Sequence, residues 1–149
     1  MSDHYLLHGI LPVLQIPFTG AGAAQTVDEV SLRAEVEFCI RAAAHGFVVP
    51  ALASEFMVLT PEERRQVVTV VVAQADDRVP VVANVAAASA QEAVAYATHA
   101  RDAGAAAVMA LPPYVRRPGA DGIFAYYDAI ARAARLPVVI QNAPPPFGV

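Results

Sequence analysis

The chain has 149 residues, a net charge of −4 and one cysteine, and 56% of its residues are hydrophobic. That length suits one domain with a sizeable core, and the lone Cys39 excludes an internal disulfide, as is usual in a reducing compartment. The ten cationic residues are scattered along an acidic chain, which argues against nucleic-acid binding. No apolar run approaches the roughly 20 residues of a membrane helix, and the chain does not start with the basic region of a secretory signal. We therefore expect a cytoplasmic protein that binds no membrane.

The first predicted strand and helix follow a polar tail at residues 1–8. Residues 10–16 are apolar enough for a buried strand. The segment Thr26–Glu29 has the spacing of a capping box, which predicts a helix from there to about Ala44. Gly46 follows and is expected to end that helix.

A second strand and helix are predicted around a loop of small and polar residues. The strand covers residues 47–49. The helix runs from Pro61 to Ala75, because Thr60 and Glu63 form a capping box and Pro61 suits the first helical position. Its interior valines are weak helix formers, so packing must stabilise it.

Later segments continue the same alternation. We predict three more strands and two more helices: strands at 79–84, 107–111 and 136–142, and helices from the Ser89 capping box to about Ala103 and from about Asp121 to Ala134.

Apolar strands therefore recur at intervals of about 30 residues, with a helix between each pair. Continuous apolar strands are typical of buried parallel sheets. Repeated strand–helix units form either an open doubly wound sheet or a (β/α)8 TIM barrel. Neither a GxGxxG motif nor a P-loop occurs, so we prefer the barrel. About five strands and four helices make an incomplete barrel, and we interpret residues 1–149 as the N-terminal part of a single TIM-barrel domain.

The loop after residues 47–49 is the first candidate site. Ser54 and Glu55 are its polar pair. Catalytic groups of α/β proteins lie on loops that leave the carboxyl ends of the strands. The alternative is a plain connection in which a buried carboxylate holds the loop.

Four segments, in order along the chain, resemble the dihydrodipicolinate synthase/N-acetylneuraminate lyase family of class I aldolases. The segment from Gly9 to Phe18 is similar to the opening G-(x)-TPF segment, and the segment from Ala51 to Arg64 is similar to the GTTGE loop followed by LTxEER. The segment from Arg78 to Ala83 is similar to the RVPVIAGV strand. The segment from Pro113 to Pro144 is similar to the TPYY and LPVxLYNxP motifs. The resemblance implies a TIM-barrel lyase, aldolase or dehydratase that acts on a 2-oxo acid such as pyruvate. It also implies a lysine Schiff base, no cofactor and a homo-oligomer.

Only some of the family's catalytic residues have the same residue at the matching position of this chain. Gln141 occupies the position of the family's acid/base tyrosine, and glutamine cannot titrate. Tyr114 matches the first tyrosine of TPYY, whereas Val115 replaces the second. We take Gln141 and Tyr114 as the candidate catalytic residues.

The candidate substrate-binding residues lie at the ends of two predicted strands. The resemblance suggests Ala53, Ser54 and Glu55 in the first loop, and Asn142 beside Gln141. The two threonines of GTTGE correspond to Leu52 and Ala53, so only backbone N–H groups and the Ser54 hydroxyl could hold a carboxylate.

The chain contains no lysine, since all ten cationic residues are arginine. In the family, the Schiff-base lysine lies on the sixth strand, beyond this chain. Arginine cannot replace it, because imine formation needs an amine that can lose its proton. We therefore expect residues 1–149 alone to be inactive.

Two other functions stay open. The chain could be a catalytically inactive half-barrel with a structural or assembly role, whose sheet edges a second copy or a partner covers. A metal-dependent aldolase on the same barrel is the weaker option, because the histidines show no metal-ligand spacing and we expect no metal.

Overall fold

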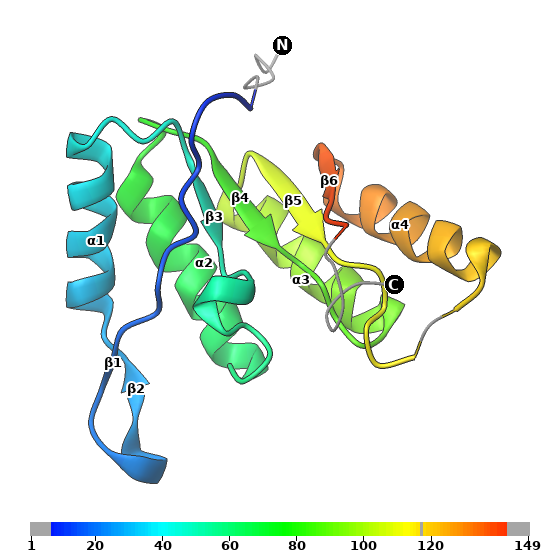
Figure 1. Ribbon diagram of the computed structural model, residues 1–149, viewed down its shortest axis with the longest axis horizontal. Coiled ribbons are helices and arrows are strands. Elements are labelled where there is room, and N and C mark those ends of the chain that lie inside the picture. Colours follow the sequence, from blue (N-terminus) through cyan, green and yellow to red (C-terminus); the bar gives the residue numbers. More distant parts are fainter. Residues whose placement is uncertain (1–6, 117, 143–149) are drawn as a thin grey trace. The chain divides into compact units, whose positions relative to one another are not determined.

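The computed structural model describes residues 7–116 and 118–142, and the chain divides into two compact units, Met1–Val82 and Ala83–Val149 (Figure 1). Each unit alternates strands with helices, as the repeat predicted. Within the described ranges, no helix combines the length and apolar character needed to cross a bilayer.

The first unit contains two α-helices and three short strands. In chain order its elements are β1 (Phe18–Thr19), the 3-10 helix η1 (Gly22–Ala24), β2 (Thr26–Val27), α1 (Glu29–Arg41), β3 (Phe47–Val49), the 3-10 helix η2 (Leu52–Ser54) and α2 (Pro61–Ala75). Strands β1 and β2 form an antiparallel hairpin that the sequence did not predict. Helices α1 and α2 pack side by side (Figure 1).

The predicted strand at residues 10–16 is present only as a single bridge, which is a correction. Val13 pairs in parallel with Val48 of β3. The Val48 amide donates to the Pro12 carbonyl over 3.0 Å, and the Leu14 amide donates to the Val48 carbonyl over 3.3 Å. Pro12 has no N–H group, so it cannot donate a ladder hydrogen bond. The segment nevertheless runs along β3, where the barrel prediction places its first strand.

Both ends of α1 differ from the prediction. The N-cap is Asp28, whose carboxylate accepts from the Ser31 amide and from the Ser31 hydroxyl. Thr26, the predicted cap, lies in β2 instead, where it pairs with Thr19. The helix ends at Arg41, and Ala43 with a φ of 61° makes the turn that Gly46 was expected to make.

Helix α2 matches the prediction at both ends. The Thr60 hydroxyl accepts from the Glu63 amide, and the Glu63 carboxylate accepts from the Thr60 amide, which completes the capping box. The face of α2 that includes Val67 and Val71 is buried. That face contributes to an apolar core made of Leu14, Val27, Leu32, Val36, Phe47, Val49, Val67, Val70, Val71, Ala75 and Val81.

Gly46 is required by a close approach between two backbones. A Cβ atom at this position would lie 2.7 Å from the Pro80 carbonyl oxygen, which accepts from the Phe47 amide. We predict that Gly46→Ala lowers the free energy of unfolding by about 1–3 kcal/mol, because backbone atoms must shift. Urea denaturation would measure the loss. Gly119→Ala is the matched control, since a Cβ there meets nothing within 4 Å; equal losses for both variants would contradict the prediction.

A cluster of polar side chains, which we call the polar clamp, joins α1 to α2. The Glu37 carboxylate of α1 accepts from both terminal guanidinium nitrogens of Arg78 and, over 2.6 Å, from the Gln74 side-chain amide. Arg78 also donates to the backbone carbonyls of Gln74 and Ala75 at the end of α2. The Arg78 and Gln74 hydrogen bonds lower the pKa of Glu37 from 4.5 to about 2.

This clamp predicts an acid-sensitive contribution to stability. A carboxylate whose pKa is depressed in the folded state stabilises the fold fully above its unfolded pKa of 4.5, and the contribution is lost as the pH falls through about 2. We expect Glu37→Gln to lower the urea midpoint at pH 7, and the difference from wild type to vanish near pH 2. Glu62→Gln, on the exposed side of α2, is the control. A difference that persists unchanged below pH 2 would contradict the assignment.

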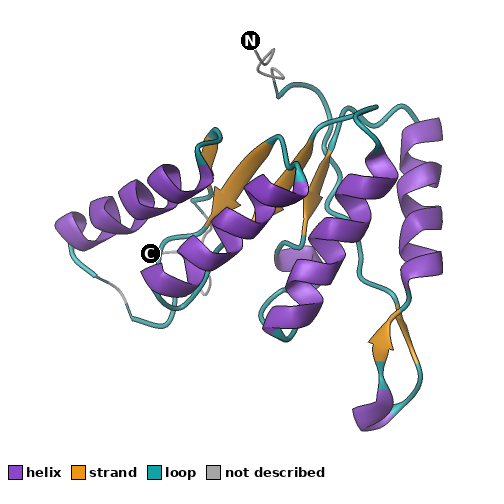
Figure 2. Cartoon of the chain, turned by 180° about the vertical axis from the view of Figure 1, so that it is seen from behind, coloured by secondary structure: helices purple, strands orange, loops and turns teal. Residues whose placement is uncertain are grey.

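The second unit contains two strand–helix repeats. Strand β4 (Val81–Asn84) crosses the boundary, and α3 (Ala90–Ala103), β5 (Ala107–Ala110), α4 (Ala120–Ala134) and β6 (Val138–Ile140) follow. Strands β5 and β6 are parallel, with Val108 opposite Val138 and Ala110 opposite Ile140. Figure 2 shows α3 lying over the strands of this unit. The predicted elements are confirmed, although the strands are shorter than expected.

Two tyrosines, Tyr96 and Tyr126, are buried in this unit. The Tyr126 hydroxyl accepts from the Ala87 amide over 3.1 Å, which ties α4 to the loop after β4. Tyr96 donates to the Glu92 carboxylate, one turn earlier on α3. Gly104, with a φ of 93°, is the C-cap of α3.

Candidate functional site

The loop after β3 is held in place by the Ser54 hydroxyl. This hydroxyl accepts from the Ala51 amide over 3.0 Å and donates to the Leu14 carbonyl over 2.5 Å. Ser54 is buried, and so are Ala51 and Leu14. A serine hydroxyl has one proton to donate. Ser54 donates it to the Leu14 carbonyl, so the hydroxyl has no proton left to donate to a substrate carboxylate.

Glu55 follows Ser54 in the left-handed backbone conformation, with a φ of 53°. This turn leaves Glu55 exposed, while the next residue, Phe56, is buried. The predicted pair therefore separates into an inward-facing serine and an outward-facing glutamate.

Three of the predicted substrate-binding residues line one small pocket of about 90 Å³: Ala53, Ser54 and Glu55. The other lining residues are Gln15, Ile16, Phe18, Val58 and Leu59. Sequence reasoning missed Gln15, although it stands near the end of the predicted strand at 10–16. In a barrel the carboxyl ends of the strands carry the site, so that position was the available signal.

A buried arginine supports the same loop from α2. The Arg64 guanidinium lies over the Phe56 ring, 5.0 Å from its centroid, and Arg64 is almost fully buried. A cation over an aromatic face is favourable when both are shielded from water. The sequence signal was the spacing of Arg64 from Val67 and Val71, which places all three on one face of α2.

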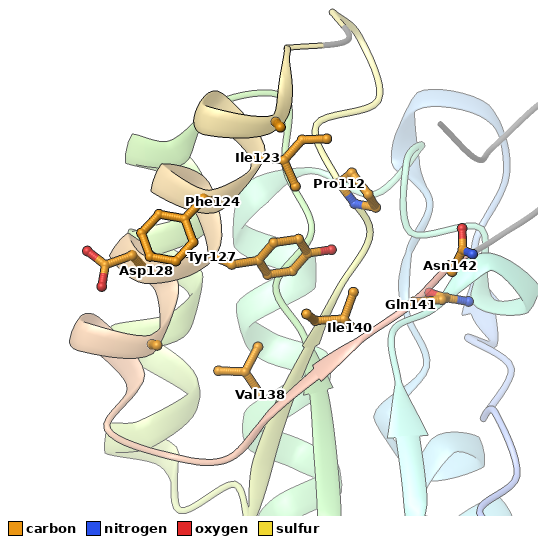
Figure 3. Close-up of a pocket in the computed structure, with 11 residues that line it drawn as sticks. Pro112, Ile123, Phe124, Tyr127, Asp128, Val138, Ile140, Gln141 and Asn142 are labelled. Carbon is orange, nitrogen blue, oxygen red and sulfur yellow. The ribbon is translucent and has the colours of Figure 1, made fainter.

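The second candidate region lies at the end of β6. The Gln141 amide donates to the Ala110 carbonyl over 2.9 Å, which continues the parallel pairing beyond Ile140. Gln141 and Asn142 lie on the rim of a pocket of about 740 Å³ between α4 and β6. Figure 3 shows Val138 and Ile140 from β6 and Tyr127 from α4 pointing into this cavity.

The Tyr127 phenol is one of the polar groups that line this mostly apolar pocket. It donates to the Ala110 carbonyl over 2.9 Å, so Ala110 accepts from both Tyr127 and Gln141. Burial raises the pKa of Tyr127 well above its usual value, so the phenol stays protonated and acts as a donor. Sequence reasoning did not anticipate this contact.

Tyr114 lies in the loop between β5 and α4 and is half-buried. It lines neither of the two pockets. Residues 53–55 belong to the first unit, whereas Tyr114, Gln141 and Asn142 belong to the second. That these residues meet in one site stays a prediction. Among residues 7–116 and 118–142, no group of three or more histidine, cysteine, aspartate or glutamate side chains is placed to hold a metal ion.

The comparisons with known proteins agree on one family. Residues 6–149 match the model of the dihydrodipicolinate synthetase family. The chain belongs to this family. Its 4-hydroxy-tetrahydrodipicolinate synthase relatives include that of Agrobacterium fabrum, 37% identical over 94% of this chain and 47% of the relative, and that of Rhizobium meliloti, 38% identical over 93% and 46%.

Solved structures extend the likeness to the fold. Dihydrodipicolinate synthase from Aquifex aeolicus matches with a TM-score of 0.87 and 27% identity over 93% of this chain and 46% of that one. The enzyme from Acinetobacter baumannii, solved in complex with pyruvate, matches with a TM-score of 0.84 and 32% identity over 91% and 46%. The predicted incomplete TIM barrel is thereby confirmed, and the chain spans about half the length of these family members.

Proposed function

We propose that residues 1–149 are the N-terminal part of a single TIM-barrel lyase that acts on a 2-oxo acid through a lysine imine, with the lysine outside this chain. Family membership carries the proposal, because the curated relatives at 37–38% identity are 4-hydroxy-tetrahydrodipicolinate synthases. The solved relative with pyruvate bound supports a 2-oxo acid as the substrate class. We extend the family's homo-oligomeric state to this protein on the same basis.

Within this proposal, the small pocket beside η2 contacts the substrate. Because the Ser54 hydroxyl already donates to the Leu14 carbonyl, we assign Ser54 to positioning the loop. The side-chain amide of Gln15, on the same pocket, is the neutral donor suited to a carboxylate. Glu55 would disfavour a carboxylate close to its own charge, so it suits a hydroxyl or amine group of the substrate.

Gln141 takes an orienting role in this proposal. Its amide can donate and accept hydrogen bonds, but it cannot exchange a proton with the substrate at neutral pH. The acid/base work of the reaction therefore falls to another group or to water. Asn142, next to Gln141 on the pocket rim, offers the same pair of hydrogen-bonding groups.

Borohydride trapping of the full-length gene product would test this function. We expect pyruvate with borohydride to add one reduced adduct per chain, on a lysine outside residues 1–149, because reduction makes an imine permanent. The protein incubated with pyruvate alone is the control. The absence of an adduct with pyruvate and with other 2-oxo acids would refute the imine mechanism.

A shared barrel mouth is a further consequence of the proposal. The carboxyl ends of parallel barrel strands lie on one face, so Ser54 and Glu55 after β3 should lie near Gln141 after β6. Cysteines at Glu55 and Gln141 in a Cys39→Ser background should be joined by a short bifunctional maleimide. The shared barrel mouth would be refuted if the two cysteines are not crosslinked and a crystal structure places positions 55 and 141 at opposite ends of the strands.

The second candidate function is an inactive half-barrel that assembles with a copy or a partner. The apolar cavity between α4 and β6 favours it, because Phe124 and Ile140 are 74% and 63% exposed. Exposed apolar surface beside an edge strand is a common association site. Phe124→Glu should then abolish association of the 149-residue chain. A monomeric chain that retains solubility, together with imine trapping in the longer product, would favour the enzyme.

A further inference from the structure

The hydrogen-bond ladder between β5 and β6 is interrupted just after the backbone amide of Gln141. This amide donates to the Ala110 carbonyl over 2.9 Å, one residue beyond the pair of Ala110 and Ile140. In a parallel ladder the next hydrogen bond would run from the amide of residue 112 to the Gln141 carbonyl. Residue 112 is proline, which has no N–H group to donate. The bond from Gln141 to Ala110 therefore stands at a strand end, where local opening is easiest.

The Tyr127 phenol reinforces this strand end from the side of α4. It donates to the same Ala110 carbonyl over 2.9 Å. A backbone carbonyl has two lone pairs, so the phenol and the Gln141 amide together fill its capacity as an acceptor. Ala110 is buried, and water competes little for a buried hydrogen bond. Figure 3 shows the Tyr127 ring extending from α4 toward the end of β6, where Gln141 lies.

The Tyr127 ring is itself held in place. It packs edge-to-face against the Tyr126 ring, with 5.4 Å between the centroids and 82° between the planes. Tyr126 is buried, and its hydroxyl accepts from the Ala87 amide in the segment after β4. Burial raises the pKa of Tyr127, so at neutral pH its phenol keeps the proton that it donates. Two adjacent tyrosines of α4 therefore hold the chain at the carboxyl ends of β4 and β5.

Tyr127 reaches Gln141 through the backbone. Val138 and Ile140 of β6 point into the cavity beside α4 (Figure 3). Successive side chains of a strand point to opposite faces, so the Gln141 side chain is expected on the face away from Val138 and Ile140. The phenol thus fixes the peptide from which this side chain starts, and leaves its amide group open to a ligand.

We propose that Tyr127 is a positioning residue for Gln141, whose side-chain direction it fixes through the shared Ala110 carbonyl. The inference rests on the proposed function, in which Gln141 has an orienting role. An orienting group loses its effect when its position varies, and a strand end that opens readily would let Gln141 vary. Tyr127 contacts the backbone of the fold, so it acts through Gln141 and is not itself a catalytic residue.

Hydrogen exchange of the full-length gene product tests the positioning without any substrate. Tyr127→Phe keeps the ring and removes only the hydroxyl. We expect the Gln141 amide of this variant to exchange about fivefold faster, as for the loss of one net hydrogen bond. Mass spectrometry at residue resolution measures the rate. The Val108 amide, which donates to the Pro137 carbonyl earlier in the same ladder, is the internal control and should keep its rate.

Tyr126→Phe is the matched variant, because it removes the neighbouring hydroxyl of the same helix. It should speed exchange at Ala87, where that hydroxyl accepts, and leave the Gln141 rate unchanged. The positioning role is overturned if the Gln141 amide of Tyr127→Phe exchanges at the wild-type rate. It is also overturned if the Val108 amide is accelerated equally, because the effect is then a general loss of stability.

Exchange of the pyruvate methyl hydrogens for deuterium from D2O measures the effect on the chemistry. Under the proposed imine mechanism, a proton leaves the methyl carbon and a deuteron returns to it, so the rate reports proton transfer. Tyr127→Phe should lower kcat by about threefold to tenfold and leave KM within about twofold, because orientation changes and binding does not. In a Gln141→Ala background, Tyr127→Phe should lower kcat no further, since it acts through Gln141.

Failure of the proposed function has a different signature. Wild-type protein that neither traps pyruvate with borohydride nor exchanges its methyl hydrogens would refute that function and the orienting role of Gln141 with it. The amide exchange rates would still decide whether the Tyr127 phenol fixes the strand end. With an active wild type, an equal loss of kcat from Tyr127→Phe in the presence of Gln141 and in the Gln141→Ala background would overturn the positioning role.

Discussion

Residues 1–149, tested alone, are expected to form no imine with pyruvate at any internal position. Imine formation needs a nucleophilic amine that is neutral at the working pH, normally a lysine whose pKa is lowered by burial. This chain has arginine at every cationic position, and arginine stays protonated throughout the accessible pH range. The remaining amine is the N-terminus, for which the ordinary pKa is about 8.

Mass spectrometry after borohydride reduction measures this result directly. The intact 149-residue chain should keep its mass, or gain an adduct only on the N-terminal peptide, which peptide mapping identifies. The full-length gene product, treated in parallel, is the positive control. Stoichiometric adduct at an internal residue, together with turnover of the substrate, would show that the chemistry of this protein does not depend on a lysine beyond Val149.

Helix α2 shows how far local sequence signals determine the fold. Thr60, Pro61 and Glu63 specify the helix start through hydrogen bonds that involve only near neighbours. The start of α1 is different, because Thr26 and Asp28 both have capping potential. The β1–β2 hairpin settles the choice by taking Thr26 into pairing with Thr19. The pairing of Thr26 with Thr19 is a contact between two strands, so it cannot be predicted from the spacing of the capping residues.

The candidate site was predictable in position more than in detail. Parallel strands explain why Ala53, Ser54 and Glu55 share a pocket at the end of β3. The direction of each side chain could not be predicted, because it follows from the 3-10 turn η2 and the positive φ of Glu55. The hydrogen bond from the Ser54 hydroxyl to the Leu14 carbonyl, which turns this hydroxyl away from a ligand, could therefore not be predicted from the sequence.

Ser54→Ala is expected to destabilise the first unit strongly. The substitution removes the acceptor for the Ala51 amide and the donor for the Leu14 carbonyl, and both backbone groups are buried. Leaving such groups without a partner costs about 1–3 kcal/mol each, less whatever other partners they find. We expect urea denaturation to show a loss of about 2–3 kcal/mol in the free energy of unfolding, from the combined effect of the two contacts.

Ser31→Ala is the matched control, because its hydroxyl also makes a short hydrogen bond, 2.7 Å to the Asp28 carboxylate, but in an exposed position. Water can replace that contact, so the loss should stay under about 1 kcal/mol. The comparison also separates two roles for Ser54. Truncating a positioning residue lowers stability. Truncating a residue that only binds substrate would leave stability unchanged and, under the proposed function, raise the KM of the full-length gene product. Equal stability of Ser54→Ala and wild type would therefore return Ser54 to the substrate-binding role that its sequence position suggested.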